Sequence, residues 1–130
     1  QFMDPTGLTE KNRSTAADLA KMVAAAHTYP EIRQASTTGG SDVLPFGSNN
    51  TLKYHNSNAL VRSPNWQIGV SKTGYIGAAG RCLVMQATIV GKPYIIVLLD
   101  SATKNSRLGD AERIKNWIES QQSTSIRTAS

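Results

Sequence analysis

Apolar runs separated by glycine-containing turns occupy the middle of the chain, and this pattern constrains the fold more than any other feature of the sequence. Residues 66–75 are strand-like and end in a glycine-rich turn. Two apolar, β-branched runs follow at 82–90 and 94–99, and Gly91-Lys92 between them fits a two-residue hairpin turn. Three consecutive antiparallel strands are therefore predicted.

A helix is predicted on the N-terminal side of these strands. Ser14 or Thr15 is a suitable N-cap, and Asp18 stands three residues after Thr15 in a position like that of a capping box. Apolar residues recur at helical spacing over 19–26, and Pro30 marks the end of the segment. We expect this helix to serve core packing.

A second helix is predicted near the C-terminus. Asp110 is a candidate N-cap, and Ile114, Trp117 and Ile118 mark one face that should pack across the sheet. Residues 36–58, by contrast, are rich in Gly, Ser, Thr and Asn, which predicts a long loop that holds at most one short hairpin.

Composition excludes several classes of site. The 130 residues suffice for one core, and the net charge of +5 comes from scattered basic residues, without the clustered stripe that favours nucleic-acid binding. Cys82 is the single cysteine, so an internal disulfide is excluded, and its apolar surroundings predict a buried thiol. His27 and His55 lack metal-ligand spacing, no metal or other cofactor is expected, and no run reaches transmembrane length.

The strongest candidate for a binding site is the triplet Lys72-Thr73-Gly74, at the end of the first predicted strand. It places an ammonium, a hydroxyl and a backbone without a side chain on one strand edge. This combination suits a peptide carboxylate or carbonyl. Lys-Thr-Gly triplets also occur among the signature elements of penicillin-binding proteins and class A β-lactamases.

Four segments, taken in order, resemble one family. They are Phe-Met-Asp-Pro-Thr-Gly-Leu at 2–8, Ser-Thr-Ala-Ala-Asp-Leu-Ala at 14–20, Asn-Ala-Leu at 58–60, and the region 68–80 that includes the triplet. Together they resemble the C-terminal half of the catalytic domain of the low-molecular-mass penicillin-binding proteins, which are serine D-Ala-D-Ala peptidases. Within this family the pattern is similar to the D-alanyl-D-alanine endopeptidases of the penicillin-binding protein 7/8 type.

The resemblance implies an α+β fold, the C-terminal part of a penicillin-binding/β-lactamase-like transpeptidase domain, whose antiparallel sheet has three strands in this chain and carries packed helices. Residues 1–121 would belong to that domain, and 122–130 would form a polar, disordered tail. The family's nucleophilic serine, in Ser-x-x-Lys, and its Ser-x-Asn element would precede the first residue of this chain. Two look-alikes, at 101–104 and 48–50, are interpreted as coincidences.

The resemblance also assigns roles to residues. Lys72 would add positive potential and hold the Ser-x-Asn serine, Thr73 would donate to the substrate carboxylate, and Gly74 would let the substrate backbone approach closely. The backbone N–H of Tyr75 would be the second oxyanion donor. Arg107 falls where related carboxypeptidases bind a terminal carboxylate, and the alternative for it is a surface arginine before a helix.

These roles describe a bacterial, exported, periplasmic enzyme that acts on peptidoglycan peptides and binds β-lactam antibiotics, with this chain alone inactive. The sheet would be completed by the missing N-terminal part of the same protein or by a self-association partner, and no nucleic-acid partner is expected. One alternative is a non-catalytic peptidoglycan-binding or interaction module. A β-lactamase fragment is disfavoured, because no Glu-x-x-Leu-Asn element precedes Lys72.

Overall fold

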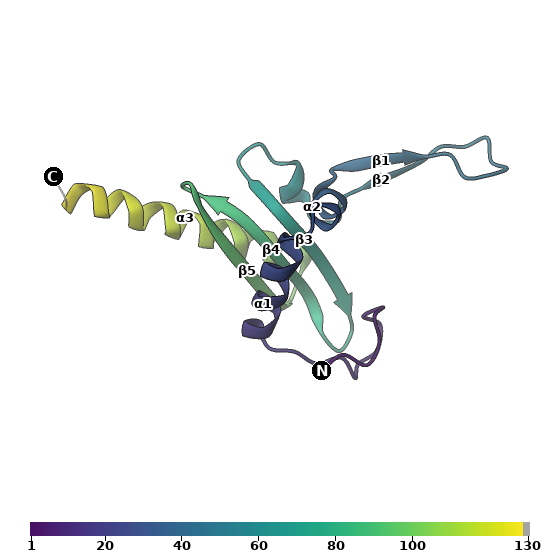
Figure 1. The fold of residues 1–130 in the computed structure, drawn as a ribbon, viewed down its shortest axis with the longest axis horizontal. Helices are drawn as coiled ribbons and strands as arrows, with labels where there is room; N and C mark the ends of the chain where they lie inside the picture. Colours follow the sequence, from purple (N-terminus) through teal and green to yellow (C-terminus); the bar gives the residue numbers. More distant parts are fainter. Residues whose placement is uncertain (129–130) are drawn as a thin grey trace.

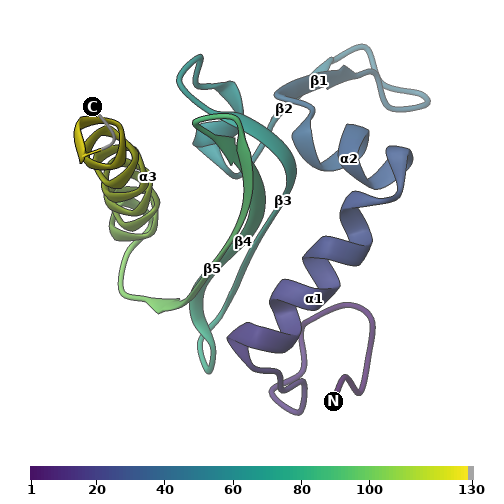
Figure 2. The same ribbon diagram turned by 60° about the vertical axis from the view of Figure 1, so that its left-hand side comes forward.

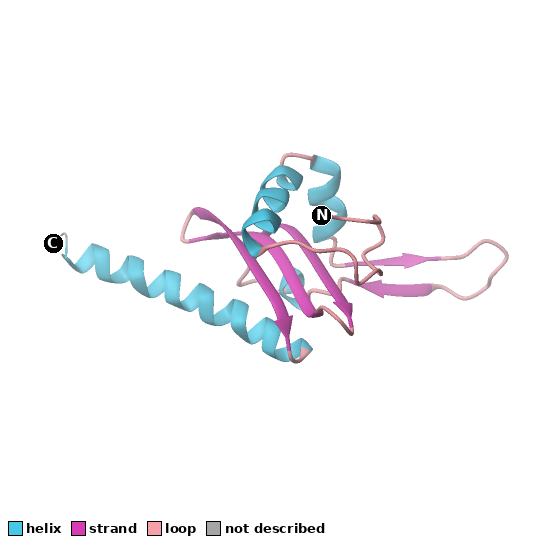
Figure 3. Ribbon diagram, turned by 90° about the horizontal axis from the view of Figure 1, so that it is seen from below, coloured by secondary structure: helices cyan, strands magenta, loops and turns pink. Residues whose placement is uncertain are grey.

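Three antiparallel strands form the central sheet of the computed structural model, which describes residues 1–128. They are β3 (Gln67–Ile76), β4 (Gly80–Ile89) and β5 (Lys92–Ser101), in the order β3-β4-β5 (Figure 3). The three predicted strands are confirmed. The turn between β4 and β5 is Val90-Gly91 rather than Gly91-Lys92. Val90 and Gly91 both have positive φ, as the two central residues of a type I′ hairpin turn require.

Helices cover both faces of this sheet. Figure 2 shows α3 (Lys104–Thr128) on one side, and α1 (Ala16–His27) and α2 (Pro30–Thr37) on the other. Burial of apolar side chains drives this arrangement, since both faces of the sheet carry apolar side chains that the helices cover. The main core consists of Leu60, Trp66, Leu83, Met85, Ala87, Ile89, Ile96, Ala111 and Ile118. The predicted α+β class is confirmed.

The first predicted helix is confirmed as α1. Thr15 is its N-cap, and the Thr15 hydroxyl accepts a hydrogen bond of 3.1 Å from the backbone N–H of Asp18. Val23 is the buried residue of α1, and the helix packs against the sheet. Pro30 does not only end the segment, as we expected, but also begins α2, because a proline needs no N–H bond in the first turn of a helix.

A short hairpin lies in the segment predicted as a long loop. β1 (Gly40–Val43) and β2 (Leu52–His55) pair antiparallel, and all of their residues are exposed. Figure 1 shows this hairpin projecting away from the sheet. A single 3-10 turn, η1 (Ala59–Arg62), then leads into β3, with Asn58 as its N-cap.

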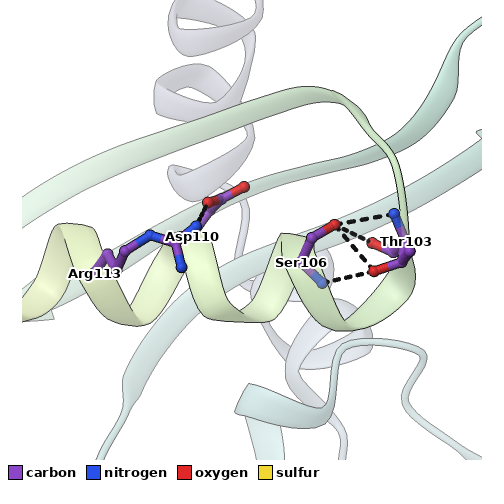
Figure 4. Close-up of polar contacts among 4 residues, drawn as sticks. All are labelled: Thr103, Ser106, Asp110 and Arg113. Atoms are coloured by element: carbon purple, nitrogen blue, oxygen red, sulfur yellow. Dashed lines mark hydrogen bonds and ion pairs between the residues drawn. The ribbon is translucent and has the colours of Figure 1, made fainter.

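The C-terminal helix begins six residues earlier than the predicted cap, Asp110. The Thr103 hydroxyl accepts from the backbone N–H of Ser106 at 2.9 Å, and the Ser106 hydroxyl accepts from the backbone N–H of Thr103 at 2.9 Å (Figure 4). This reciprocal cap satisfies backbone donors of the first turn, so the helix starts there. Asp110 instead forms an ion pair with Arg113 inside α3.

Two further expectations for this helix need correction. Trp117 does not pack on the sheet with Ile118, because 64% of its surface is exposed. Residues 122–128, expected to be disordered, continue α3, while residues 129 and 130 of the expected tail lie outside the described residues. No helix within residues 1–128 combines the length and the apolar content needed to cross a membrane.

The N-terminal segment is ordered by polar contacts. Asn12 binds the backbone N–H of Met3 through its side-chain oxygen at 2.7 Å. Desolvation raises the pKa of Asp4, but hydrogen bonds from Gly7, Asn12 and Thr6 outweigh it and leave that pKa below its usual value. The Phe-Met-Asp-Pro-Thr-Gly-Leu segment is therefore a compact, hydrogen-bonded turn.

Candidate functional site

A groove of about 650 Å³ opens beside β3. Its walls come from α2, from the base of the β1–β2 hairpin and from β3, and Ile32, Tyr54, Ser57, Lys72 and Thr73 are among its lining residues. β3 is an edge strand of the sheet that residues 1–128 form. A peptide laid along such an edge can form strand-type hydrogen bonds with it.

The structure places the triplet at this open edge. The Lys72 ammonium is exposed and donates to the backbone carbonyl of Thr73. Thr73 is half-buried, and its hydroxyl oxygen lies 2.6 Å from that of Ser57. A side chain added at Gly74 would meet no atom within 4 Å, so the space above it is open. An ammonium, an oriented hydroxyl and accessible backbone therefore lie together beside the groove.

Tyr75 follows the triplet and is paired with an arginine. Its side chain is exposed, and the guanidinium carbon of Arg81, directly opposite on β4, lies 4.4 Å from the centre of its ring. This distance is that of a cation–π contact. The expected role of Tyr75 concerns its backbone N–H alone. Its ring contacts Arg81 instead.

Arg107 is not a surface residue, so the alternative that we considered for it is wrong. Only 4% of its surface is exposed, and its Nη1 donates to the backbone carbonyl of Cys82 at 2.9 Å. The pairing of β4 with β5 is irregular here and skips Cys82. Within the described chain, the buried Nε of Arg107 has no hydrogen-bond partner.

This buried guanidinium is a positive charge that contacts β4 at Cys82, the strand partner of Gly74. Burial lowers the pKa of Arg107 from its ordinary value, and the charge of Arg81 lowers that pKa further. A guanidinium nonetheless remains protonated at neutral pH. Cys82, which Arg107 contacts, is half-buried rather than buried as expected, and it lies opposite Gly74 on β3. Arg107 and the triplet thus both contact β4 at Cys82, near the start of that strand.

Neither serine of the look-alike motifs lines the groove beside β3. Ser101 is the last residue of β5 and Lys104 is the first residue of α3, so they do not share a helical turn. Ser48 lies in the loop at the end of the hairpin, where its hydroxyl bonds the backbone of Asn50. Among residues 1–128 no three His, Cys, Asp or Glu side chains are grouped as metal ligands would be.

One residue at the site was missed by the sequence analysis. Ser57 lines the groove and contacts Thr73, but a single serine in a Ser- and Asn-rich segment gives no signal of its own. The neighbouring Asn-Ala-Leu segment, one of the four that carry the resemblance, was the nearest indication.

Known proteins match both the sequence and the fold. The D-alanyl-D-alanine endopeptidase of Escherichia coli K12 is 44% identical over 120 residues, which cover 92% of this chain and 38% of that protein. The D-alanyl-D-alanine endopeptidase of Pseudomonas aeruginosa is 40% identical over 129 residues, covering 99% of this chain and 42% of its own length. The chain thus spans about two fifths of the relatives it matches.

Solved structures agree. A Streptomyces DD-transpeptidase superposes with a TM-score of 0.71 at 32% identity, over 84% of this chain and 43% of that one. A penicillin-binding protein of Listeria monocytogenes, in an ampicillin-bound form, superposes with a TM-score of 0.67 at 25% identity, over 88% of this chain and 46% of that one. These neighbours confirm the transpeptidase-like fold. Residues 1–103 match the D-alanyl-D-alanine carboxypeptidase family, and the chain belongs to that family.

Proposed function

We propose that this chain is the C-terminal part of a serine D-alanyl-D-alanine peptidase that hydrolyses cross-links or stem peptides of bacterial peptidoglycan. The observation that carries the proposal is the position of Lys72, Thr73 and Gly74 on an exposed edge strand beside a groove. The two endopeptidase relatives are 44% and 40% identical to this chain, which favours endopeptidase action.

The residues of the site have distinct roles in this proposal. The peptide lies antiparallel to β3, with its carboxylate at the Thr73 hydroxyl and its backbone close to Gly74. Lys72 supplies positive potential, and the N–H of Tyr75 donates to the oxyanion. Arg107 adds a buried positive charge that contacts the strand partner of Gly74.

The nucleophile comes from a part of the protein outside this chain. A serine oxygen there attacks the D-Ala carbonyl, the amide bond breaks, and the serine proton passes to the leaving amine. Water then hydrolyses the resulting ester. A β-lactam would acylate the same serine, as the ampicillin-bound form of the Listeria relative suggests for its own site. The substrate places the intact protein in the periplasm.

Labelling with fluorescent penicillin tests this proposal. The chain alone should remain unlabelled, and the longer protein that carries it should be labelled stoichiometrically. In that longer protein, Lys72→Ala should slow acylation more than about tenfold, because it removes a charge aimed at the reacting groups. Lys92→Ala, an exposed lysine at the start of β5, is the matched control and should have no effect. Labelling of the chain alone at Ser101 would refute the proposal.

A non-catalytic peptidoglycan-binding module is the second candidate. It is supported by the groove beside Lys72 and Thr73, which can bind a peptide without any nucleophile. The upstream coding sequence separates the two candidates. A Ser-x-x-Lys element there supports the peptidase, and its absence supports the binding module.

A further inference from the structure

The hydroxyl of Ser57 is the nearest side-chain partner of the substrate-binding triplet. Its oxygen lies 2.6 Å from that of Thr73, although the two residues are 16 positions apart in the sequence. Both residues line the groove, so a ligand carboxylate at Thr73 would also approach Ser57. The proposed function gives Thr73 a role but leaves Ser57 without one.

We propose that Ser57 is a positioning residue, whose hydroxyl directs the Thr73 proton toward the carboxylate of a D-Ala-D-Ala peptide. This inference rests on the proposed function. A hydroxyl has a single proton. If Thr73 donates to Ser57, the Thr73 proton is no longer available to a carboxylate bound at Thr73. If Ser57 donates to Thr73, the Thr73 proton is free, and an arriving carboxylate, which only accepts, selects this second arrangement. The two bonds then polarise each other.

The backbone on both sides of Ser57 is held firmly, which a positioning residue requires. The Asn56 side chain donates to the carbonyls of Ser36 and Thr38, at 2.9 and 3.0 Å, and so ties this segment to the end of α2. Asn58 is fully buried and donates to the Ser71 hydroxyl on β3 at 2.9 Å.

The two asparagines are also linked to each other. The Asn56 side-chain oxygen accepts from the backbone N–H of Asn58 at 3.0 Å, across the residue between them. Ser57 itself is exposed and has Thr73 as its only side-chain partner among the described residues. Its hydroxyl is therefore held in place by its neighbours while remaining open to a ligand.

Kinetics of the longer protein test the inference, with two N-acylated peptides ending in D-Ala-D-Ala, one with a free carboxylate and one amidated. With the free peptide, Ser57→Ala should raise KM roughly threefold to tenfold, as loss of one hydrogen bond does, and leave kcat nearly unchanged. Ser57→Thr should restore the KM. With the amidated peptide, Ser57→Ala should have no effect, because there is no carboxylate to bind.

Ser48→Ala is the matched control, since Ser48 is in the hairpin loop and bonds only the backbone of Asn50 within the described chain. An unchanged KM in Ser57→Ala, or an equal loss with both peptides, would overturn the inference. Failure of the wild-type protein to hydrolyse these peptides and also a cross-linked peptide dimer would instead refute the proposed function. NMR couplings then decide the positioning role in this chain: Thr73 should occupy one side-chain rotamer, and Ser57→Ala should average it. Identical couplings would refute the role.

Discussion

At the scale of single residues, Arg107 has two roles to separate. It donates a hydrogen bond to the Cys82 carbonyl, and it is expected to help bind the substrate carboxylate. Arg107→Ala should lower the free energy of unfolding by about 1–3 kcal/mol, because the Cys82 carbonyl would be left without its donor. Urea unfolding of the chain measures this. Arg113→Ala is the control: its side chain is 72% exposed, and its loss should cost less than about 1 kcal/mol. Equal effects of the two substitutions would contradict the prediction.

The same arginine permits a functional prediction in the longer protein. Arg107→Ala should raise KM for a peptide with a free carboxylate more than it slows acylation by a β-lactam, because the β-lactam carboxylate retains Thr73. Comparing the peptide KM with the rate of penicillin labelling in one preparation separates the two effects. A parallel loss in both would indicate that Arg107 acts only by supporting the fold.

The residues of the site differ in how far the sequence could identify them. Lys72 to Tyr75 are consecutive on one strand, so a local pattern was sufficient. Ser57 reaches Thr73 only when η1 and β3 pack together, and nothing local to Ser57 indicates this. The burial of Arg107 depends on the irregular pairing of β4 with β5 near Cys82, which a pattern of apolar residues does not contain.

At the scale of elements, β5 is the second edge of the sheet that the described residues form. Ile95 and Leu99 on this strand are 36% and 44% exposed, and an apolar edge with unpaired backbone groups favours association with another strand. We therefore predict that the isolated chain self-associates. Ile95→Lys should reduce the association, because a charge on an edge strand opposes pairing.

Sedimentation velocity over a range of concentrations measures this effect. Leu44→Lys is the control, since Leu44 is more exposed but lies at the end of the β1–β2 hairpin, away from β5. If Leu44→Lys alone abolished the association, the hairpin and not the edge strand would be the contact. A compact monomer at all concentrations would contradict the prediction.

The errors at element boundaries share one cause. The position of α3 was predicted from Asp110, a good N-cap residue, whereas Thr103 and Ser106 cap each other about two turns earlier. Likewise, Pro30 was read only as a stop, although proline also suits the first turn of a helix, and α2 was missed. Each of these two segments contains more than one residue that can begin a helix. The contacts of the folded chain determine which one does.

At the scale of the whole molecule, the layered architecture was predictable and the extent of its parts was not. The alternation of apolar runs with turns specified the antiparallel sheet and its strand order, because consecutive strands joined by short turns pair with each other. The length of α3 was not specified, since its C-terminal part is polar and its helical state is not required by any packing in the core.

The division of the chain at residue 121 gives a last prediction. The last residue of α3 in the core is Ile118, and in Figure 1 the helix continues beyond the edge of the sheet. Deletion of residues 122–130 should therefore change the free energy of unfolding by less than about 0.5 kcal/mol, as for other surface changes. Ile118→Ala in the same chain is the comparison, and it should cost about 2–5 kcal/mol, because it leaves a cavity between α3 and the sheet. Urea unfolding of both variants measures the difference, and a deletion as damaging as Ile118→Ala would show that residues 122–130 belong to the folded domain.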